Sequence, residues 1–302
     1  MNTVAAPLLS VDNTTEVARV RHQLALGLQG VDALTQAPME AGMGRSIRAD
    51  LASIGARPWV QRLDSHSQGR HALRFAGRYE KLLLRAVAMG DPLVHQVFVH
   101  GARDAHMGNY SVDNDPRIFV PRRLSLTPVL VAGLPASSLA NARTAWLWPG
   151  PAYPLPSKAT AVRGRIQRDL GAGRKEPIRW TRVVMTRAGA GAANLATEEA
   201  LAWAHGDERG EFLLVLGGNA VMGAALPPLL NVNVWVFQPP VATVWDPAQP
   251  LNSLPLEDGG TAVLNEVLKG RAMPASYVQQ SARTLGLKLG EVLTMNEADL
   301  LF

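Results

Sequence analysis

Glycine and proline are so frequent in this chain that they exclude long helices. The 302 residues include 27 Gly and 21 Pro, so a residue that breaks a helix occurs about every six positions. Helix interiors tolerate neither residue well, whereas short strands joined by turns accommodate both. The sequence therefore predicts a mostly β fold built from many short strands.

The composition is that of a chain that buries a core. Hydrophobic residues make up 47% of the chain and charged residues 18%, unlike a disordered protein. The length favours two domains, although one or three also fit. The absence of cysteine excludes disulfides, thiolate metal sites and a cysteine nucleophile. The first residues lack a secretory signal pattern and no stretch approaches the roughly 18 apolar residues of a membrane helix, so we expect a cytoplasmic protein outside the membrane.

The net charge of +5 comes from arginines that are scattered at strand-like spacing. A nucleic-acid binder pairs such a basic stripe with a recognition helix or an aromatic stacking platform. Neither pattern accompanies the densest basic runs, so we interpret these residues as solvated strand faces or protein interfaces and do not expect nucleic acid as a partner. The runs are Arg117, Arg122, Arg123 and Arg163, Arg165, Arg168, Arg174, Lys175.

The first half of the chain predicts an arm followed by a β-rich domain. Residues 1–16 mix apolar and polar positions without a period, which indicates an arm, and residues 17–145 form the domain. Helical spacing competes with alternation around residues 17–40, and the alternation and glycines favour a strand there. Pro121 favours an edge strand for residues 118–126. Other strands are expected at 45–51, 70–88 as one or two strands separated at Gly77, 93–100 and 129–133.

A stiff linker is predicted at residues 146–159. Four prolines occur in the twelve residues that begin at Trp146, and such a segment is extended and excluded from a central strand. Its aromatic residues Trp146, Trp148 and Tyr153 are expected to cover a seam between domains. The alternative is that they form a platform for a ligand.

Residues 160–240 predict strands around a tight turn. The expected strands are 160–167, 177–185, 201–205, 211–216 and 232–237, and a long Gly/Ala-rich loop spans 188–195. In the turn at residues 206–210, Asp207 is suited to accept hydrogen bonds from the backbone and Gly210 to adopt a positive φ. Phe212 then points into the core.

Three short motifs give this region a family resemblance. They are Val162-Arg-Gly164-Arg-Ile166, then Pro177-Ile178 followed by Val183 or Val184, and lastly Asp207-Glu-Arg-Gly210-Glu-Phe212. The region resembles the carboxypeptidase regulatory-like module, a transthyretin (prealbumin)-like β-sandwich of seven strands. Gly206 stands where the family has Thr, Thr181 stands near its usual Ala, and the hairpin after Val184 is longer. The resemblance implies a sandwich that serves as a scaffold, adhesion unit or spacer, without catalysis.

The first domain contains a weaker resemblance to the same series of sequence motifs. Residues 27–51 resemble the opening of such a sandwich, and the Gly77-Arg-Tyr stretch resembles its closing strand. We therefore expect tandem Ig- or transthyretin-like β-sandwich domains with short helices and a long C-terminal extension, residues 241–302. The extension is expected to contain a helix at 261–269 that ends at Gly270 and a strand at 282–293. Its apolar Leu300, Leu301 and Phe302 are expected to dock on this chain or on a neighbouring subunit.

The chain offers four weak candidates for chemistry, and none supports a catalytic, cofactor or metal site. His95 and His100 are five apart on a strand and face opposite ways, and His106 and Asp104 complete that set. Three further sets each lack a decisive part. Asp113, Asn114 and Asp115 lack the Gly and Glu of a calcium loop. His205 and Asp207 with Ser137 or Ser138 lack a Gly-x-Ser-x-Gly elbow, and Gly189 with Gly191 lacks the Lys of a phosphate loop.

Two functions remain open from the sequence. The first is a non-catalytic structural or interaction protein whose partners are copies of itself or other structural subunits, as in a phage virion, a tail or a contractile injection particle. The second is a carbohydrate- or ligand-binding protein, or an enzyme with an accessory sandwich. Its substrate platform would combine Trp146, Trp148 and Tyr153 with Asp104 and His106.

Overall fold

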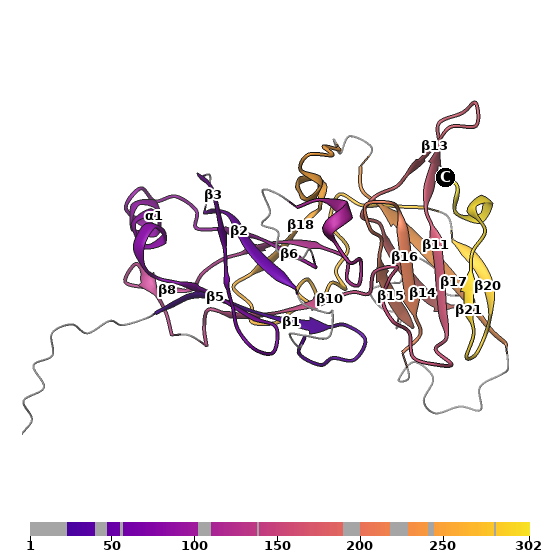
Figure 1. The fold of residues 1–302 in the computed structure, drawn as a ribbon, viewed down its shortest axis with the longest axis horizontal. Helices are drawn as coiled ribbons and strands as arrows, with labels where there is room; N and C mark the ends of the chain where they lie inside the picture. The colour runs from indigo at the N-terminus through magenta and orange to yellow at the C-terminus, as the bar shows by residue number, and fades with distance from the viewer. Residues whose placement is uncertain are drawn as a thin grey trace, which may run out of the picture.

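Strands dominate the computed structural model (Figure 1), which confirms the predicted mostly β, multi-sheet fold. The structure describes residues 23–39, 47–54, 57–101, 110–137, 139–189, 200–217, 229–240, 245–280 and 282–302. The predicted arm at 1–16 and most of the loop at 188–195 lie outside these residues. Within the described ranges there is one α-helix, and no helix there is long and apolar enough to cross a membrane.

Two facing sheets form the N-terminal sandwich. One sheet has the order β10-β1-β5-β4 and the other β18-β7-β6-β2-β3. Apolar residues from both sheets meet in one cluster, among them Leu26 and Leu73 from the first and Leu51, Val97 and Leu124 from the second. The strands are β1 (Leu24–Asp32), β2 (Arg48–Ile54), β3 (Arg57–Arg62), β4 (Asp64–Ser65), β5 (Arg70–Arg74), β6 (His95–His100), β7 (Arg122–Leu126), β10 (Ala142–Leu147) and β18 (Leu256–Gly260).

A second pair of sheets forms the C-terminal sandwich. Its sheets have the orders β16-β11-β21 and β15-β14-β17-β19, and β20 also pairs with β17. Val162 and Phe212 from the first sheet meet Val183, Val234 and Leu287 from the second. The strands are β11 (Ala161–Arg165), β14 (Arg182–Arg187), β15 (Ala202–His205), β16 (Glu211–Val215), β17 (Leu229–Gln238), β19 (Val278–Gln279), β20 (Arg283–Lys288) and β21 (Val292–Thr294). The hairpin of β12 (Gln167–Asp169) and β13 (Lys175–Pro177) stands out from this sandwich (Figure 1).

Strand β16 belongs to the cores of both sandwiches. Successive side chains of a strand point to opposite faces. Phe212 and Leu214 face the C-terminal core, whereas Leu213 and Val215 join the N-terminal core together with Tyr153. The outer face of the C-terminal sandwich is therefore packed against the N-terminal one, and apolar burial joins the two halves.

Residues 241–302 contribute to both sandwiches and not to the C-terminal one alone. β18 runs parallel to β7 in the N-terminal sheet, whereas β19, β20 and β21 lie in the C-terminal sandwich. The last residues dock on this chain: Leu300 is fully buried beside Gly164, and Phe302 exchanges backbone hydrogen bonds with Gln167 and Asp169. Leu301 forms a parallel bridge with Gln167.

The prediction of a strand after Gly77 is wrong, because Gly77–Ala88 is the α-helix α1. Tyr79, Leu83 and Ala86 are its buried residues, and their spacing of four and three is that of one helix face. The intervening Glu, Lys, Leu and Arg residues are good helix formers. The echo of a closing strand in this segment therefore does not hold, although the domain is a sandwich.

Three further predictions need correction. β7 pairs with both β6 and β18, so it is not an edge strand; Pro121 precedes the first ladder residue, Arg122, and costs the sheet no hydrogen bond. Residues 261–269 contain turns and no helix. The structure also places Trp146 and Leu147 in β10, paired with Val31 and Asp32, and not in a linker.

The turn that precedes β16 allows a direct test of glycine at Gly210. Gly210 has a φ of 73°, and a Cβ there would lie 2.4 Å from the carbonyl oxygen of Ile166. Gly171, in the β12–β13 hairpin, has a similar φ of 77° with nothing within 4 Å of a Cβ. Gly171→Ala should cost about 1–2 kcal/mol of stability from the left-handed backbone alone.

Gly210→Ala carries the same backbone cost and a backbone clash in addition, so we expect a clearly larger loss than for Gly171→Ala. Urea unfolding of both variants measures the difference. Equal losses would show that the turn relaxes to admit the methyl group.

Candidate functional site

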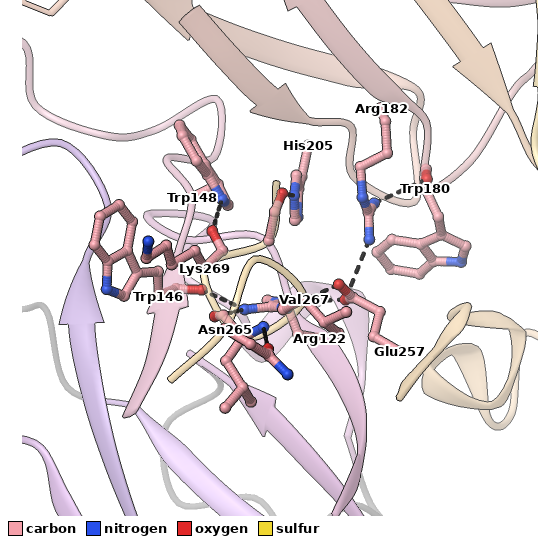
Figure 2. Close-up of polar contacts among 12 residues, drawn as sticks. Arg122, Trp146, Trp148, Trp180, Arg182, His205, Glu257, Asn265, Val267 and Lys269 are labelled. Carbon is pink, nitrogen blue, oxygen red and sulfur yellow. Dashed lines mark hydrogen bonds and ion pairs between the residues drawn. The ribbon is translucent and has the colours of Figure 1, made fainter. Parts of the chain in front are cut away.

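Three charged side chains from three distant segments meet in the seam between the sandwiches (Figure 2). Arg122 comes from β7, Arg182 from β14 and Glu257 from β18, and all three are buried. Arg122 grips the carboxylate with two parallel bonds, Nε to Oε1 at 3.0 Å and Nη2 to Oε2 at 2.7 Å. Arg182 Nη2 donates to Oε1 at 3.2 Å. One carboxylate thus joins the N-terminal sandwich to the C-terminal one.

The remaining donors of Arg122 are satisfied by backbone carbonyls. Nη1 donates to the carbonyls of Trp146 and Leu268, each at 2.7 Å, and Nη2 donates to that of Val267. A buried cation is tolerated only when its donors are paired in this way. Burial by itself raises the pKa of Glu257, but the charges of Arg122 and Arg182 outweigh burial and hold that pKa below its usual value.

The segment at residues 265–270 is clamped between the sandwiches, and we call it the strap. The indole of Trp148 donates to the carbonyl of Lys269 at 2.9 Å, and His205 Nε2 donates to that of Gly270 at 2.9 Å. A Cβ on Gly270 would lie 2.6 Å from Trp148 Nε1 and 2.9 Å from His205 Cε1, so a glycine is needed here. The carbonyls of Leu268, Lys269 and Gly270 thus bind groups of the two sandwiches, and the predicted helix at 261–269 is absent.

Apolar side chains complete the seam around the ion triad. Trp180 of the C-terminal half packs with Phe98 and Val120 of the N-terminal sandwich and with Leu251 and Leu254. Its indole donates to Ser253 Oγ at 2.8 Å. The seam therefore combines charge pairing with a core of its own.

The three aromatic residues singled out from the sequence all lie in or beside this seam. Trp146 and Trp148 are buried with Val31 and Ala33, and Trp148 lies 5.8 Å from the His205 ring. Tyr153 donates to Asp32 Oδ2 at 2.6 Å and packs in the N-terminal core. Because all three rings are buried, the structure does not present them as an open platform.

A second polar contact across the seam is a cluster of buried acids. Asp115 lies before β7, and Asp207 and Glu208 lie in the turn before β16. Tyr110 donates to Asp115 Oδ2 at 2.8 Å. Nearby, Arg117 and Glu211 form an ion pair of 3.1 Å.

The acids of this cluster bind protons more tightly than usual. Burial, and then the charge of Glu208, raise the pKa of Asp207 to about 7. Burial and the charge of Asp115 raise the pKa of Glu208, and burial raises that of Asp115. Asp207 Oδ2 and Glu208 Oε1 are buried without a hydrogen bond among the described residues. Ionisation of this cluster therefore opposes the folded state.

The predicted turn residues are placed as follows. Asp207 Oδ1 accepts hydrogen bonds from the backbone of Arg209 at 2.9 Å and of Glu211 at 2.8 Å. Gly210 has the left-handed backbone described above, and Phe212 is buried in the C-terminal core. The turn thus performs a structural role and at the same time presents Asp207 to the seam.

The candidates for chemistry are dispersed by the fold. His95 Nε2 lies 2.7 Å from Tyr79 Oη, whereas His100 Nε2 lies 3.1 Å from Asp50 Oδ2. His205 bonds to Gly270 and not to Asp207, and burial lowers the pKa of His205 well below its ordinary value, so the ring is neutral. Among the described residues no three His, Cys, Asp or Glu side chains are placed to hold a metal ion.

The other members of those sets are partly outside the described residues. Asp113 and Asn114 belong to a short 3-10 turn at Val112–Asn114, in which Asn114 accepts from the Ser111 backbone. Ser137 lies in the loop after β9 (Leu134–Pro135), and Gly189 in the turn after β14. Asp104, His106, Ser138 and Gly191 lie outside the described residues.

Comparisons with known proteins assign no family to the chain. No protein-family model and no curated protein matches it. Three similar solved structures are a 9R-lipoxygenase from Cyanothece (13% identity, 35% of this chain and 16% of that one, TM-score 0.20), the TIE protein of Bacillus anthracis (8%, 90% and 33%, 0.22) and a minor pilin of Streptococcus agalactiae (6%, 89% and 93%, 0.23). The chain thus spans well under two thirds of the first two. Likenesses this weak carry no argument, and the carboxypeptidase regulatory-like resemblance stays a prediction.

Removal of the central carboxylate tests the triad. Glu257→Gln leaves two buried arginines without their counter-charge, and breaking a buried ion pair in this way typically costs about 3–5 kcal/mol. Guanidinium unfolding followed by tryptophan fluorescence measures the change in the free energy of unfolding.

Glu266→Gln is the matched control. Glu266 lies in the strap, pairs with Lys269 at 2.7 Å and is 59% exposed, so its loss should change stability by less than about 1 kcal/mol. If both variants unfold at the same denaturant concentration, the triad does not hold the seam.

The acid cluster predicts that stability falls as pH rises through the range from about pH 4 to pH 7. The folded protein keeps a proton on Asp207 up to a pKa of about 7, whereas the unfolded chain releases it near pH 4. Between these values the folded state binds more protons, so the free energy of unfolding decreases with pH. Thermal midpoints measured from pH 5 to pH 8 should therefore decline.

Asp207→Asn should flatten this decline, because the amide oxygen still accepts the two turn hydrogen bonds and no longer ionises. Asp169→Asn is the control, since Asp169 Oδ1 accepts from Gly171 at 2.8 Å in an exposed turn. A decline that persists unchanged in Asp207→Asn would assign the pH effect to other groups.

Proposed function

We propose that this chain is a non-catalytic structural or protein-interaction component, a subunit of a large assembly such as a phage virion, a phage tail or a contractile injection particle. The observation that carries the proposal is the triad of Arg122, Glu257 and Arg182. It fixes the two sandwiches to each other through a single buried carboxylate. Two sandwiches held in a fixed arrangement suit a subunit that sets the spacing between its neighbours in a large assembly.

The use of the aromatic residues supports the same function. Trp146, Trp148 and Tyr153 lie in or beside the seam, where the polar atoms of Trp148 and Tyr153 bond to the protein itself and all three rings are buried. Side chains of a sugar platform need an open ring face, which these rings do not offer. Their placement favours rigid joining over ligand capture.

The protruding β12–β13 hairpin is a suitable contact for a neighbouring subunit. Its tip exposes Leu170 between turn residues, together with the cations Arg174 and Lys175. Leu170 would offer a partner an apolar contact, and the two cations would offer it charged ones. We propose that partners, either copies of this chain or other structural subunits, engage this hairpin in the cytoplasm.

A second candidate function is ligand binding at a small pocket beside the seam. Trp180, Trp245, Arg179, Pro239 and Ser253 are among its lining residues. The Arg179 guanidinium lies 4.4 Å from the centre of the Trp245 ring. Quenching of tryptophan fluorescence by a panel of sugars and small carboxylates tests this alternative, and saturable quenching that Trp245→Ala abolishes would favour it over the structural role.

The size of the native particle tests the structural proposal. Tagged full-length chain, isolated gently from its natural source, should elute far above the 32.4 kDa of one chain and show regular particles by electron microscopy. The variant Leu170→Asp should reduce its incorporation, whereas Leu229→Asp, at an equally exposed residue on β17, should not. Elution of the chain as a free monomer from that source would overturn the proposal.

A further inference from the structure

A rigid apolar hairpin closes the end of the N-terminal sandwich that lies away from the seam (Figure 1). β8 (Leu130–Val131) pairs with β9 (Leu134–Pro135), and residues 139–141 form a turn just before β10. We call these two strands and this turn the distal hairpin. Val131, Leu134 and Leu139 are 66%, 44% and 83% exposed. No residue between Arg123 and Arg143 carries a charge, which is unusual for a surface segment.

The distal hairpin is held in place by the body of the domain. The amide side chain of Asn141 bonds both the backbone N–H of Val129, at 2.8 Å, and its carbonyl, at 3.1 Å. A Cβ built on Gly133 would lie 3.4 Å from Val87 of α1, so the turn between β8 and β9 lies against the helix. A surface that is already ordered pays little conformational entropy when a partner binds.

The chain itself brings a matching segment to this place. Gln23, the first described residue, donates its side-chain amide to the carbonyl of Pro135 in β9. The described part of the chain therefore begins beside the distal hairpin. Residues 1–11, Met-Asn-Thr-Val-Ala-Ala-Pro-Leu-Leu-Ser-Val, contain no charged side chain, and the first charge is that of Asp12.

The tether is short enough for this segment to reach the hairpin. About twelve residues separate residue 11 from Gln23, and a flexible chain of that length spans roughly 20 Å. A short tether of this kind gives an effective concentration in the millimolar range. The same segment of a second molecule matches that concentration only in very concentrated solution, so the arm of the same chain is the favoured occupant.

We propose that residues 1–11 fold back onto the distal hairpin of their own chain and cover Val131, Leu134 and Leu139. The contact is apolar. It is independent of the structural role proposed above, because it requires no second subunit.

Cross-linking tests the contact directly, because the chain has no native cysteine. Ala6→Cys and Ala140→Cys place one thiol in the arm and one in the distal hairpin without removing a large apolar side chain. A short bismaleimide should join them within one molecule, giving a cyclic species that keeps the mass of a single chain. Linked dimers would show instead that a second copy supplies the arm.

A comparison of two double variants shows whether the cross-link depends on docking of the arm or only on its attachment to the same chain. Val131→Asp with Leu139→Asp should slow the cross-link by about tenfold or more, since each large apolar side chain that the arm covers is worth about that factor. Leu229→Asp with Val292→Asp adds the same charge at residues 48% and 41% exposed on the other sandwich and should leave the rate unchanged. Equal rates in both backgrounds would overturn the proposal.

Hydrogen exchange of the unaltered protein provides a second measurement that needs no variant. Amides of residues 4–11 should exchange clearly more slowly than those of the same sequence as a free peptide, independently of protein concentration. Exchange at the free-peptide rate would contradict docking. Protection that grows with concentration would again identify a second copy as the source of the arm.

Discussion

The arrangement of this molecule depends on one carboxylate, Glu257, that two buried arginines share. Ion pairs in the interior stabilise a protein only when geometry is good and every donor is paired. Arg122 meets this condition through a bidentate grip and three carbonyls, which come from β10 and the strap. Because Arg182 binds the same carboxylate from the other sandwich, the two sandwiches cannot move apart without leaving a charge unpaired in a low-dielectric seam.

The strap contributes both hydrogen-bond acceptors and close packing to the seam. Its carbonyls accept hydrogen bonds from Arg122, Trp148 and His205, and Gly270 lets the chain pass close to the Trp148 and His205 rings. The acid cluster on the same seam works in the opposite sense, because its buried carboxylates resist ionisation. The ion triad thus stabilises the seam through opposite charges, whereas the acid cluster makes the stability of the seam depend on pH through like charges.

Strand content and most strand positions could be predicted from alternation, and the mostly β class followed from glycine and proline alone. The helix α1 differs from the prediction because Gly77 resembles a break between two strands, whereas the spacing of Tyr79, Leu83 and Ala86 indicates one helix face. The triad was missed entirely: Arg122 and Arg182 look like ordinary arginines in strands. The signal that the sequence did contain is their position beside apolar runs, Arg182 before Val183 and Val184. No local sequence pattern predicts that Glu257, some 75 residues beyond Arg182, pairs with both arginines.

The parallel pairing of β18 with β7 has a consequence for how this protein is made. Residues 256–260 form an edge of the sheet to which β2 and β6 belong, although β7 is complete at residue 126. During synthesis the N-terminal sheet must therefore wait, with one edge unpaired, until the C-terminal sandwich has largely emerged from the ribosome. Domains usually fold in the order in which they are synthesised, and unpaired strand edges invite aggregation. Here β18 completes the first sandwich only after β11 to β17 of the second have been synthesised, so the first sandwich cannot be complete before the second has largely been made.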